Sequence, residues 1–551
     1  MSPLLLHRSK NRRVTVIPDP NNSGDACHTA TDNDPRQRKY KRLMLDFWQG
    51  LLATLERLAM LPAVMHSVLP KLSPRKRTRD ALRTYDRPME DMLREIQTLF
   101  EAPLDNENLL DMSAALQRQF APKLQSSDIC MLPSYNHKLP SGLEKGTYLA
   151  LDVGGSTFRV ALVELNGKRP GAKNMRIVFM KSYKIDEKVR QRSGHDFFEW
   201  MADKIQLALA DQQLQGSAST QTFPMGLAWS FPVDANLLDM GKGFRATEGL
   251  LGQDLSELIM APCRKRNLPV HMDSIVNDSS ATLLSRAYED PSTRFAVILG
   301  TGFNISVHLP VSSLASTKYK GYPQQWMDEA THVLVNTECS MFGKGVFPTT
   351  RWDEQLNDAH VRPDFQPFEH MISGRYMGEI VRLVVVEAVR TAGLFSGEMP
   401  AHMTEPYSLD TGTIAVMEMD DSKYLGQAIA VFQSLHPLSK PPTVKDIQFV
   451  RRVAQLVSHR AAAFLATGIH ALWVLRTESE GLTPASAGRM SIGCNGSVIE
   501  KYPLFRELCQ SHLHDLTTAS GAEPKSISLE IAVESAIFGA AVSACCLEGQ
   551  A

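Results

Sequence analysis

Two glycine turns that carry hydroxyl residues are the first features of this sequence that could do chemistry. Gly154–Thr157 (GGST) lies between the apolar runs Tyr148–Val153 and Phe158–Val163, and Gly300–Gly302 (GTG) lies between two similar apolar runs. Glycine allows the backbone to approach a ligand closely, so that successive N–H groups can point at an anion, and hydroxyl groups add donors. The spaced pair therefore indicates phosphate binding by two similar α/β halves that face one another.

Polar residues between the two turns could carry a reaction. Asn277–Ser279 follows an apolar strand-like pair and precedes the helix-like Ala281–Leu284, while Ser230 ends the strand-like Gly226–Trp229. An aspartate such as Asp278, placed between a strand and a helix, can serve as a helix cap or as a catalytic carboxylate. Taken alone, this position favours the helix cap.

Composition limits the class of protein. The chain has 551 residues, enough for two to four domains, and 59 basic against 60 acidic residues give a net charge of -1. That balance excludes a globally basic nucleic-acid binder. Eight cysteines without a CxxC pair are too few for a disulfide framework, so we expect reduced thiols and a cytoplasmic protein.

The first 84 residues differ in texture from the rest. Residues 1–38 are polar and basic, which predicts a disordered tail that is dispensable for activity, or alternatively a mitochondrial leader. Leu43–Leu69 is apolar at helical spacing but contains charges and Pro62, so we expect a helix that packs on the protein or lies on a membrane surface without spanning it. Arg75–Arg79 is a solvated charge run or a nuclear signal. Peripheral membrane, mitochondrial or nuclear association thus stays open.

From about Leu132 to Ala544 the order of motifs resembles the eukaryotic, fungal-type hexokinase family, of which this chain looks like a divergent member. The matching segments are Leu151–Val160 (family LDLGGTNFRV), Ser230–Pro232 (SFP), Lys242–Phe244 (TKGF), Asn277–Ser279 (NDT), Gly300–Asn304 (GTGxN), Asn336–Glu338 (NTE), Phe368–Gly374 (FEKMISG), Tyr376–Arg382 (YLGEIVR) and Gly493–Ser497 (GVDGS).

The resemblance implies an α/β protein with a two-domain actin-like (RNase H-like) fold and a cleft between a small and a large domain. The segments that it implies are a disordered tail over 1–38, an apolar helical segment and basic linker over 39–84, helices packed on the large domain over 85–146, the small domain over 147–277, the large domain over 278–533, and a helix returning to the small domain over 534–551.

The resemblance also implies transfer of the γ-phosphoryl group of ATP to the C6 hydroxyl of a hexose, with Mg²⁺. Asp278 would be the general base, because a carboxylate in hydrogen-bond reach can take the hydroxyl proton. Lys242 would lie beside the reacting oxygen, and Asp152 would hold Mg²⁺ through water. The implied sugar-binding residues are Ser230, Lys242, Asn277, Asp278, Asn304, Glu338 and Glu369. The implied nucleotide-binding residues are Asp152, Gly154, Gly155, Ser156, Thr157, Arg159, Thr301 and Ser497.

Four departures from the family pattern affect the expectations. Gly241 replaces a threonine before Lys242, which predicts weaker glucose binding and N-acetylglucosamine as the best alternative substrate. Cys339-Ser340 replaces Trp-Gly, and Asn495 replaces the aspartate of GVDGS. Ser535–Ala541 replaces the glycine-rich GSGKGAA. Because this turn would approach adenosine, we expect Ile537 and Phe538 to crowd the adenine end of the cleft and to weaken ATP binding.

The sequence is therefore compatible with three functions. The chain is an active ATP-dependent hexokinase, an N-acetylglucosamine kinase on the same fold, or a non-catalytic hexokinase-like regulator. Retention of Asp278, Lys242, Glu338 and Glu369 favours an enzyme, because a chain freed from catalysis need not keep the base.

Overall fold

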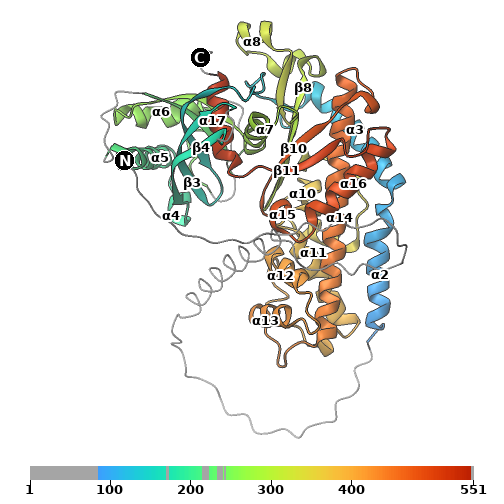
Figure 1. The fold of residues 1–551 in the computed structure, drawn as a ribbon. Helices are drawn as coiled ribbons and strands as arrows, with labels where there is room; N and C mark the ends of the chain where they lie inside the picture. Colours follow the sequence, from blue (N-terminus) through green and yellow to red (C-terminus); the bar gives the residue numbers. More distant parts are fainter. Residues whose placement is uncertain (1–84, 169–172, 214–221, 232–239, 241–243, 548–551) are drawn as a thin grey trace, which may run out of the picture. The chain divides into compact units, whose positions relative to one another are not determined.

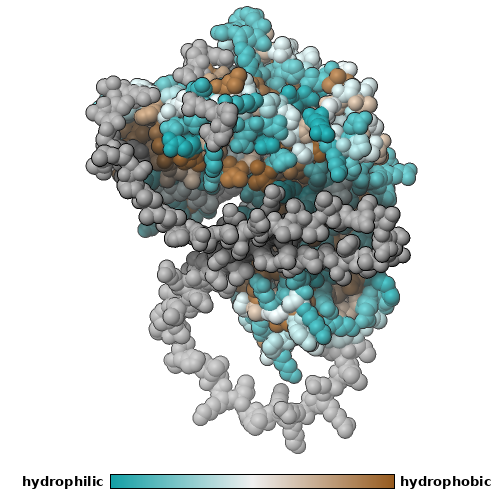
Figure 2. All heavy atoms as spheres, in the orientation of Figure 1, coloured by the Kyte–Doolittle hydropathy of each residue, from teal (hydrophilic) through white to brown (hydrophobic). Residues whose placement is uncertain are grey.

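The computed structural model describes residues 85–168, 173–213, 222–231, 240 and 244–547. The expected tail over 1–38 and the apolar segment Leu43–Leu69 lie outside the described residues. Within the described residues, no helix is long and apolar enough to cross a membrane. On the face shown in Figure 2, hydrophilic residues cover the projection that carries α8 (Gln324–Glu329).

Two sheets share one strand pattern (Figure 1). The five-stranded sheet has the order β4-β3-β2-β5-β6, and the six-stranded sheet has the order β1-β9-β8-β7-β10-β11. In each, three strands form an antiparallel meander, whose first strand also pairs in parallel with a later strand, and that later strand pairs in parallel with one more. The strands are β1 (Leu132–Pro133), β2 (Lys145–Val153), β3 (Thr157–Asn166), β4 (Met175–Lys184), β5 (Phe223–Trp229), β6 (Val270–Val276), β7 (Phe295–Leu299), β8 (Phe303–Pro310), β9 (His332–Asn336), β10 (Met490–Asn495) and β11 (Ile527–Ile531). The repeated pattern confirms the expected actin-like fold of two related halves.

The glycine turns occupy equivalent places in the two halves. Gly154–Ser156 joins β2 to β3, and Gly300–Gly302 joins β7 to β8, so each is the first hairpin of its sheet. The apolar runs on either side form strands because their side chains are buried, in β2 on both faces near its end and in β8 almost throughout. The echo seen in the sequence is thus a structural repeat.

Helices cover both sheets. Those of the five-stranded half are α4 (Glu187–Arg190), α5 (His195–Gln213) and α6 (Leu255–Lys265). The others are α2 (Met89–Glu101), α3 (Asn106–Ser126), α7 (Asp278–Glu289), α8, α9 (Arg351–Ala359), α10 (Pro367–Ile372), α11 (Met377–Thr391), α12 (Thr411–Met419), α13 (Gly426–Leu435), α14 (Val444–Ser479), α15 (Ser497–Lys501), α16 (Phe505–Ala519) and α17 (Ser535–Leu547). Short 3₁₀ turns are η1 (Ala102–Leu104), η2 (Val311–Ser313), η3 (Ser316–Tyr319), η4 (Cys339–Met341), η5 (Leu394–Gly397) and η6 (Pro484–Ser486).

Two helices join the halves. α7 and α17 pack on each other, and α17 also packs on β2, β5 and β6 of the five-stranded sheet (Figure 1). Their buried side chains form one core cluster with residues of both sheets, including Ala228 of β5 and Ala296 of β7. Small residues allow this contact: a Cβ on Gly539 of α17 would lie 1.9 Å from the carbonyl oxygen of Ala281 in α7.

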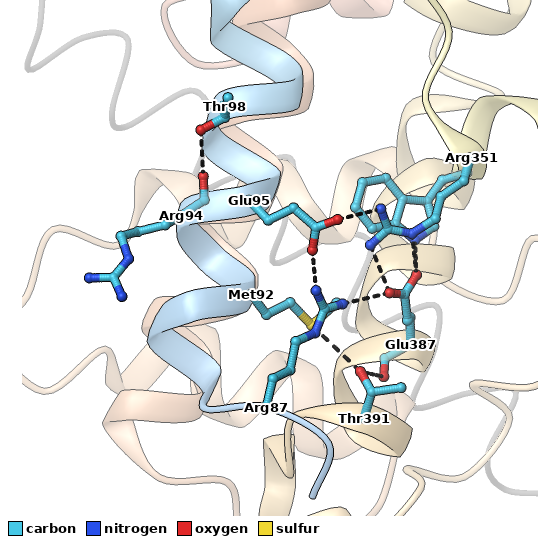
Figure 3. A network of polar contacts seen from close by, with 9 residues as sticks. Arg87, Met92, Arg94, Glu95, Thr98, Arg351, Glu387 and Thr391 are labelled. Carbon is cyan, nitrogen blue, oxygen red and sulfur yellow. Dashed lines mark hydrogen bonds and ion pairs between the residues drawn. The ribbon is translucent and has the colours of Figure 1, made fainter.

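Ion pairs connect α2 to α9 and α11 (Figure 3). Arg87, just before α2, pairs with Glu95 of α2 and at 2.7 Å with Glu387 of α11. Arg351 of α9 pairs with the same two carboxylates, at 2.7 Å each. α2 and α3 also pack along α14. These contacts place α2 and α3 on the half that holds the six-stranded sheet.

Candidate active site

The end of β2 brings a buried carboxylate to the first glycine turn. Asp152 is 7% exposed, and the strand register places it opposite Arg159 of β3, whose Nη1 lies 3.4 Å from its carboxylate. The same Nη1 lies 3.3 Å from Glu534, the residue before α17. Burial raises the pKa of the Asp152 carboxyl to about 6, Arg159 opposes that rise, and the Asp278 and Glu534 carboxylates add to it. Asp152 and Glu534 therefore both pair with Arg159, and Asp278 is near enough to influence the charge of Asp152.

In the first glycine turn, backbone carbonyls accept hydrogen bonds from within the protein, which leaves backbone N–H groups available to a ligand. Ile185 N donates to Ser156 O at 2.8 Å, and Arg190 Nη2 donates to Gly155 O at 2.9 Å. The N–H groups of Gly155 and Ser156 have no hydrogen-bond partner among the described residues, and Ser156 is exposed. A Cβ on Gly155 would meet no atom within 4 Å, so space is open beside the turn. This arrangement suits an anion.

The second turn lies against the start of α15. A Cβ on Gly300 would lie 3.3 Å from Ser497 N and 3.5 Å from Ser497 Oγ, so the predicted nucleotide residue Ser497 lies close to this turn. Gly374 N donates to Gly300 O at 2.8 Å, and Ser373 Oγ donates to Thr301 O at 3.0 Å. Thr301 and Ser497 are both exposed. Ser497 therefore lies against the turn that carries Thr301, and both residues are exposed.

The predicted sugar residues Asn304, Glu338 and Glu369 also converge. Asn304 Nδ2 donates to Asn336 Oδ1 at 2.8 Å, and Asn336 Nδ2 donates to Glu338 Oε1 at 2.8 Å. Phe303 N, the neighbour of Asn304, donates to Glu369 Oε2 at 2.8 Å. Glu338 has the left-handed φ of 49°, which turns the chain sharply after β9. The amide of an asparagine can donate to and accept from sugar hydroxyls, whereas the carboxylates of Glu338 and Glu369 accept from them.

The interpretation of Asp278 as the N-cap of the helix is wrong. Asn277 is the N-cap of α7, and its Oδ1 accepts from Ser280 N at 3.0 Å. Asp278 is the first residue inside the helix, half-buried, and close enough to raise the pKa of Asp152. Because Asn277 satisfies the helix terminus, the Asp278 carboxylate has a place near the first turn that capping does not explain.

Of the other predicted site residues, Ser230 and Thr157 are described by the structure. Ser230 follows β5, and its N–H donates to Val153 O at 3.1 Å, so it lies next to the strand end that carries Asp152. Thr157 begins β3, half-buried. Lys242 and Gly241 lie outside the described residues.

A cavity of about 610 Å³ opens beside Asn277 and Asn336. One wall comes from β6 and the start of α6, including Asp254 and Asp273, and the other comes from β1 and the segment around α8, including Trp326. Its volume lies within the usual range for small-molecule sites. Of the described residues predicted to hold a sugar, Asn277 lines this cavity, whereas Asp278, Asn304, Glu338 and Glu369 are not among its lining residues.

The expectation for Ile537 is wrong. Ser535–Leu547 is a continuous helix, and the left-handed φ of 49° falls on Glu534 just before it. Ile537 is 0% exposed and belongs to the core cluster of α7, α17 and the five-stranded sheet, while Phe538 packs against the same cluster. Ile537 therefore fills the core instead of the cleft, because helical periodicity turns it inward.

Sequence inspection missed three residues near the site. Asn336 links two sugar residues, and the matched NTE segment already contained it as a signal. Glu534 pairs with Arg159, and its only signal was an acidic residue directly before an apolar helix. Arg190 reaches the first turn from the short helix α4 and had no signal in the sequence.

Two similar halves, a hydroxyl-bearing glycine hairpin on each and carboxylates near the first hairpin define a phosphotransferase of the actin-like class. Residues 92–288 and 294–546 match two family models, both described as hexokinase. The chain belongs to the hexokinase family.

Individual relatives agree with this assignment. The chain is 29% identical to hexokinase-1 of Saccharomyces cerevisiae over 429 residues, which cover 76% of this chain and 84% of the yeast protein. It is 31% identical to human hexokinase-3 over 76% of this chain and 44% of that protein. Among solved structures, the hexokinase of Schistosoma mansoni complexed with glucose has a TM-score of 0.69 and 27% identity, covering 83% of this chain and 99% of that one.

Proposed function

We propose that this chain is an ATP-dependent hexokinase that transfers the γ-phosphoryl group to the C6 hydroxyl of glucose or a similar hexose. The observation that carries the proposal is the place of Asp278. It is the first residue of α7, its charge helps to raise the pKa of the buried Asp152 carboxyl, and the neighbouring Asn277 caps the helix. The relatives named above are hexokinases, which favours this function over an N-acetylglucosamine kinase or a non-catalytic regulator.

In this proposal the hexose lies against Asn277, Asn304, Glu338 and Glu369, with Ser230 and Lys242 from the other half. The Asp278 carboxylate accepts the proton of the attacking hydroxyl as the phosphorus–oxygen bond forms. A positioned carboxylate of this kind typically contributes roughly 10²- to 10⁴-fold to the rate. The hydrogen bonds that fix Asn304 and Glu369 hold the sugar-binding groups in place before the sugar arrives.

The phosphates would meet the amides of the first turn, Arg159 and the hydroxyls of Thr301 and Ser497. Their donors suit an anion, and they come from both halves of the chain. Asp152 fits a water-mediated site for Mg²⁺, because it is a carboxylate at the end of the strand that leads into the first turn and oxygen ligands suit this ion. When bound through water near Asp152, Mg²⁺ would neutralise phosphate charge.

The cellular place of the reaction stays a prediction. A cytoplasmic enzyme is expected, whereas membrane, mitochondrial or nuclear association would depend on residues 1–84, which lie outside the described residues.

A coupled ADP-release assay tests the function. The full chain is supplied with Mg-ATP and, in turn, glucose, fructose, mannose and N-acetylglucosamine. We expect sugar-dependent ADP release that is fastest with a plain hexose and that is lost in Asp278→Asn. The control is Asp421→Asn, an exposed aspartate after α12. N-acetylglucosamine as the best substrate would support the second candidate, and no release with any sugar would contradict an enzyme.

A further inference from the structure

A guanidinium group holds the first glycine turn from behind. Arg190, the last residue of α4, donates from Nη2 to Gly155 O at 2.9 Å. The neighbouring carbonyl, Ser156 O, is held by Ile185 N from the segment just before α4. Two of the turn's carbonyls, those of Gly155 and Ser156, therefore accept hydrogen bonds from the short segment 185–190. The N–H groups of the same two residues are left for a ligand.

Arg190 is itself fixed in place. Its guanidinium carbon lies 5.7 Å from the centroid of the Phe244 ring, and its backbone oxygen accepts from Arg245 N at 2.9 Å. Phe244 in turn contacts the ring of Phe231, the residue after Ser230, with centroids 5.0 Å apart. The side chain thus has little freedom to leave the turn, since a planar guanidinium can stack and donate at the same time.

One atom of Arg190 lacks a partner. Its Nε is buried and has no hydrogen-bond partner among the described residues. A buried cationic donor without a partner is costly, so this side chain lies here at a cost that its hydrogen bond to the turn and its contact with Phe244 must offset. Arg159 supplies a second guanidinium on the β3 side of the same turn. A cation at each side of the turn would favour a polyphosphate there.

We infer that Arg190 is a positioning residue for the nucleotide, which fixes the Gly154–Ser156 turn so that its amides face the phosphates. The inference rests on the proposed function and extends it, because it assigns the phosphate affinity of the first turn to a residue outside the matched motifs. Arg190 acts through the turn and does not touch the hexose.

The test compares nucleotide and sugar binding in the full chain. Calorimetry measures the affinity for a non-hydrolysable ATP analogue with Mg²⁺ and glucose present, and separately for glucose alone. Loss of a charged hydrogen bond typically weakens binding roughly 10- to 100-fold. We expect that loss for the ATP analogue in Arg190→Gln, a smaller loss in Arg190→Lys because the charge and one donor remain, and glucose affinity within about twofold of the original chain.

Arg192→Gln is the matched control, since Arg192 is an exposed arginine two residues further on. It should bind both ligands like the original chain. In steady-state kinetics, Arg190→Gln should raise the KM for ATP and leave the KM for the sugar unchanged.

A general folding defect would weaken both ligands together and would overturn the inference, as would equal ATP-analogue affinity in Arg190→Gln and the original chain. If the original chain itself binds no nucleotide, the proposed function fails along with it. If it binds nucleotide and phosphorylates sugar but Arg190→Gln does so equally well, only this inference fails.

Discussion

At the scale of single residues, the environment of each carboxylate decides what it can do. Asp152 and Glu418 are both acids with raised pKa values, to about 6 and about 7. Asp152 stands beside an exposed turn and other carboxylates, which suits a site for cations. Glu418 of α12 instead accepts hydrogen bonds from Tyr502 Oη and, at 3.3 Å, from Ser458 Oγ. Its surroundings are a structural contact between α12, α14 and α15.

Glu418→Gln should change how stability depends on pH. Burial raises the pKa of the folded Glu418 to about 7 from an ordinary value of 4.5. Between these values the folded state keeps a proton that the unfolded state has lost, so the free energy of unfolding falls as pH rises, by at most ~1.4 kcal/mol per pH unit. Glutamine removes this contribution, so we expect the variant to gain stability relative to the original chain from pH 5 to pH 8.

Urea unfolding at several pH values measures this difference. Glu523→Gln, at an exposed position after α16, serves as the control and should show no such trend. A Glu418→Gln difference that stays constant across the range would contradict the assignment.

Local turns could be predicted from the sequence better than the direction in which a side chain points or the distant segment that it contacts. The paired glycine hairpins came out as expected, because glycine turns and strand patterns are local features. The residue that caps α7 could not be predicted, since two adjacent polar residues can each cap a helix, and the structure shows that it is Asn277. Ile537 was placed wrongly, because the face that a helical residue presents depends on the partner helix. Arg190 carried no local signal at all, since its target lies 35 positions away.

At the scale of elements, the pair α7 and α17 sets the geometry of the site. α7 begins with Asn277 and Asp278, and α17 follows Glu534, which pairs with Arg159. The two helices touch through Gly539, and the backbone of α17 also comes close to Gly226 of β5. The positions of the two carboxylates, Asp278 and Glu534, therefore depend on how closely these helices pack.

Gly539→Ala should disturb this packing. Its Cβ would lie 1.9 Å from Ala281 O, and the obstacle is backbone that cannot rotate away. Overpacking of this kind typically costs about 1–3 kcal/mol, so we expect a lower free energy of unfolding together with slower turnover. Gly426→Ala is the control, because a Cβ at the start of α13 meets no atom within 4 Å. Denaturant unfolding of both variants measures the effect; equal stability of the two would show that the helices can separate without cost.

At the scale of the whole molecule, the site is divided between two related halves. The first turn and Ser230 belong to the five-stranded half, whereas Asn304, Glu338 and Ser497 belong to the other. Each ligand would touch residues of both. If a sugar brings the two halves into the reactive arrangement, the same movement would complete the nucleotide site. ATP would then not be hydrolysed by water while the sugar is absent.

Sugar and nucleotide should therefore bind cooperatively. We expect a hexose to strengthen binding of a non-hydrolysable ATP analogue with Mg²⁺ by roughly 5- to 150-fold, and the analogue to strengthen sugar binding by the same factor, as linkage requires. Calorimetry in both orders of addition measures the two factors. Equal analogue affinity with and without the sugar would mean that the halves act independently.

The most direct measurement follows the phosphoryl group itself. The full chain is incubated with γ-labelled ATP, Mg²⁺ and glucose, and the sugar product is isolated and its position of phosphorylation determined. We predict labelled glucose 6-phosphate from the original chain and a rate roughly 10²- to 10⁴-fold lower from Asp278→Asn, with glucose binding retained. Unlabelled sugar despite bound glucose and nucleotide, or an undiminished rate in Asp278→Asn, would contradict the account.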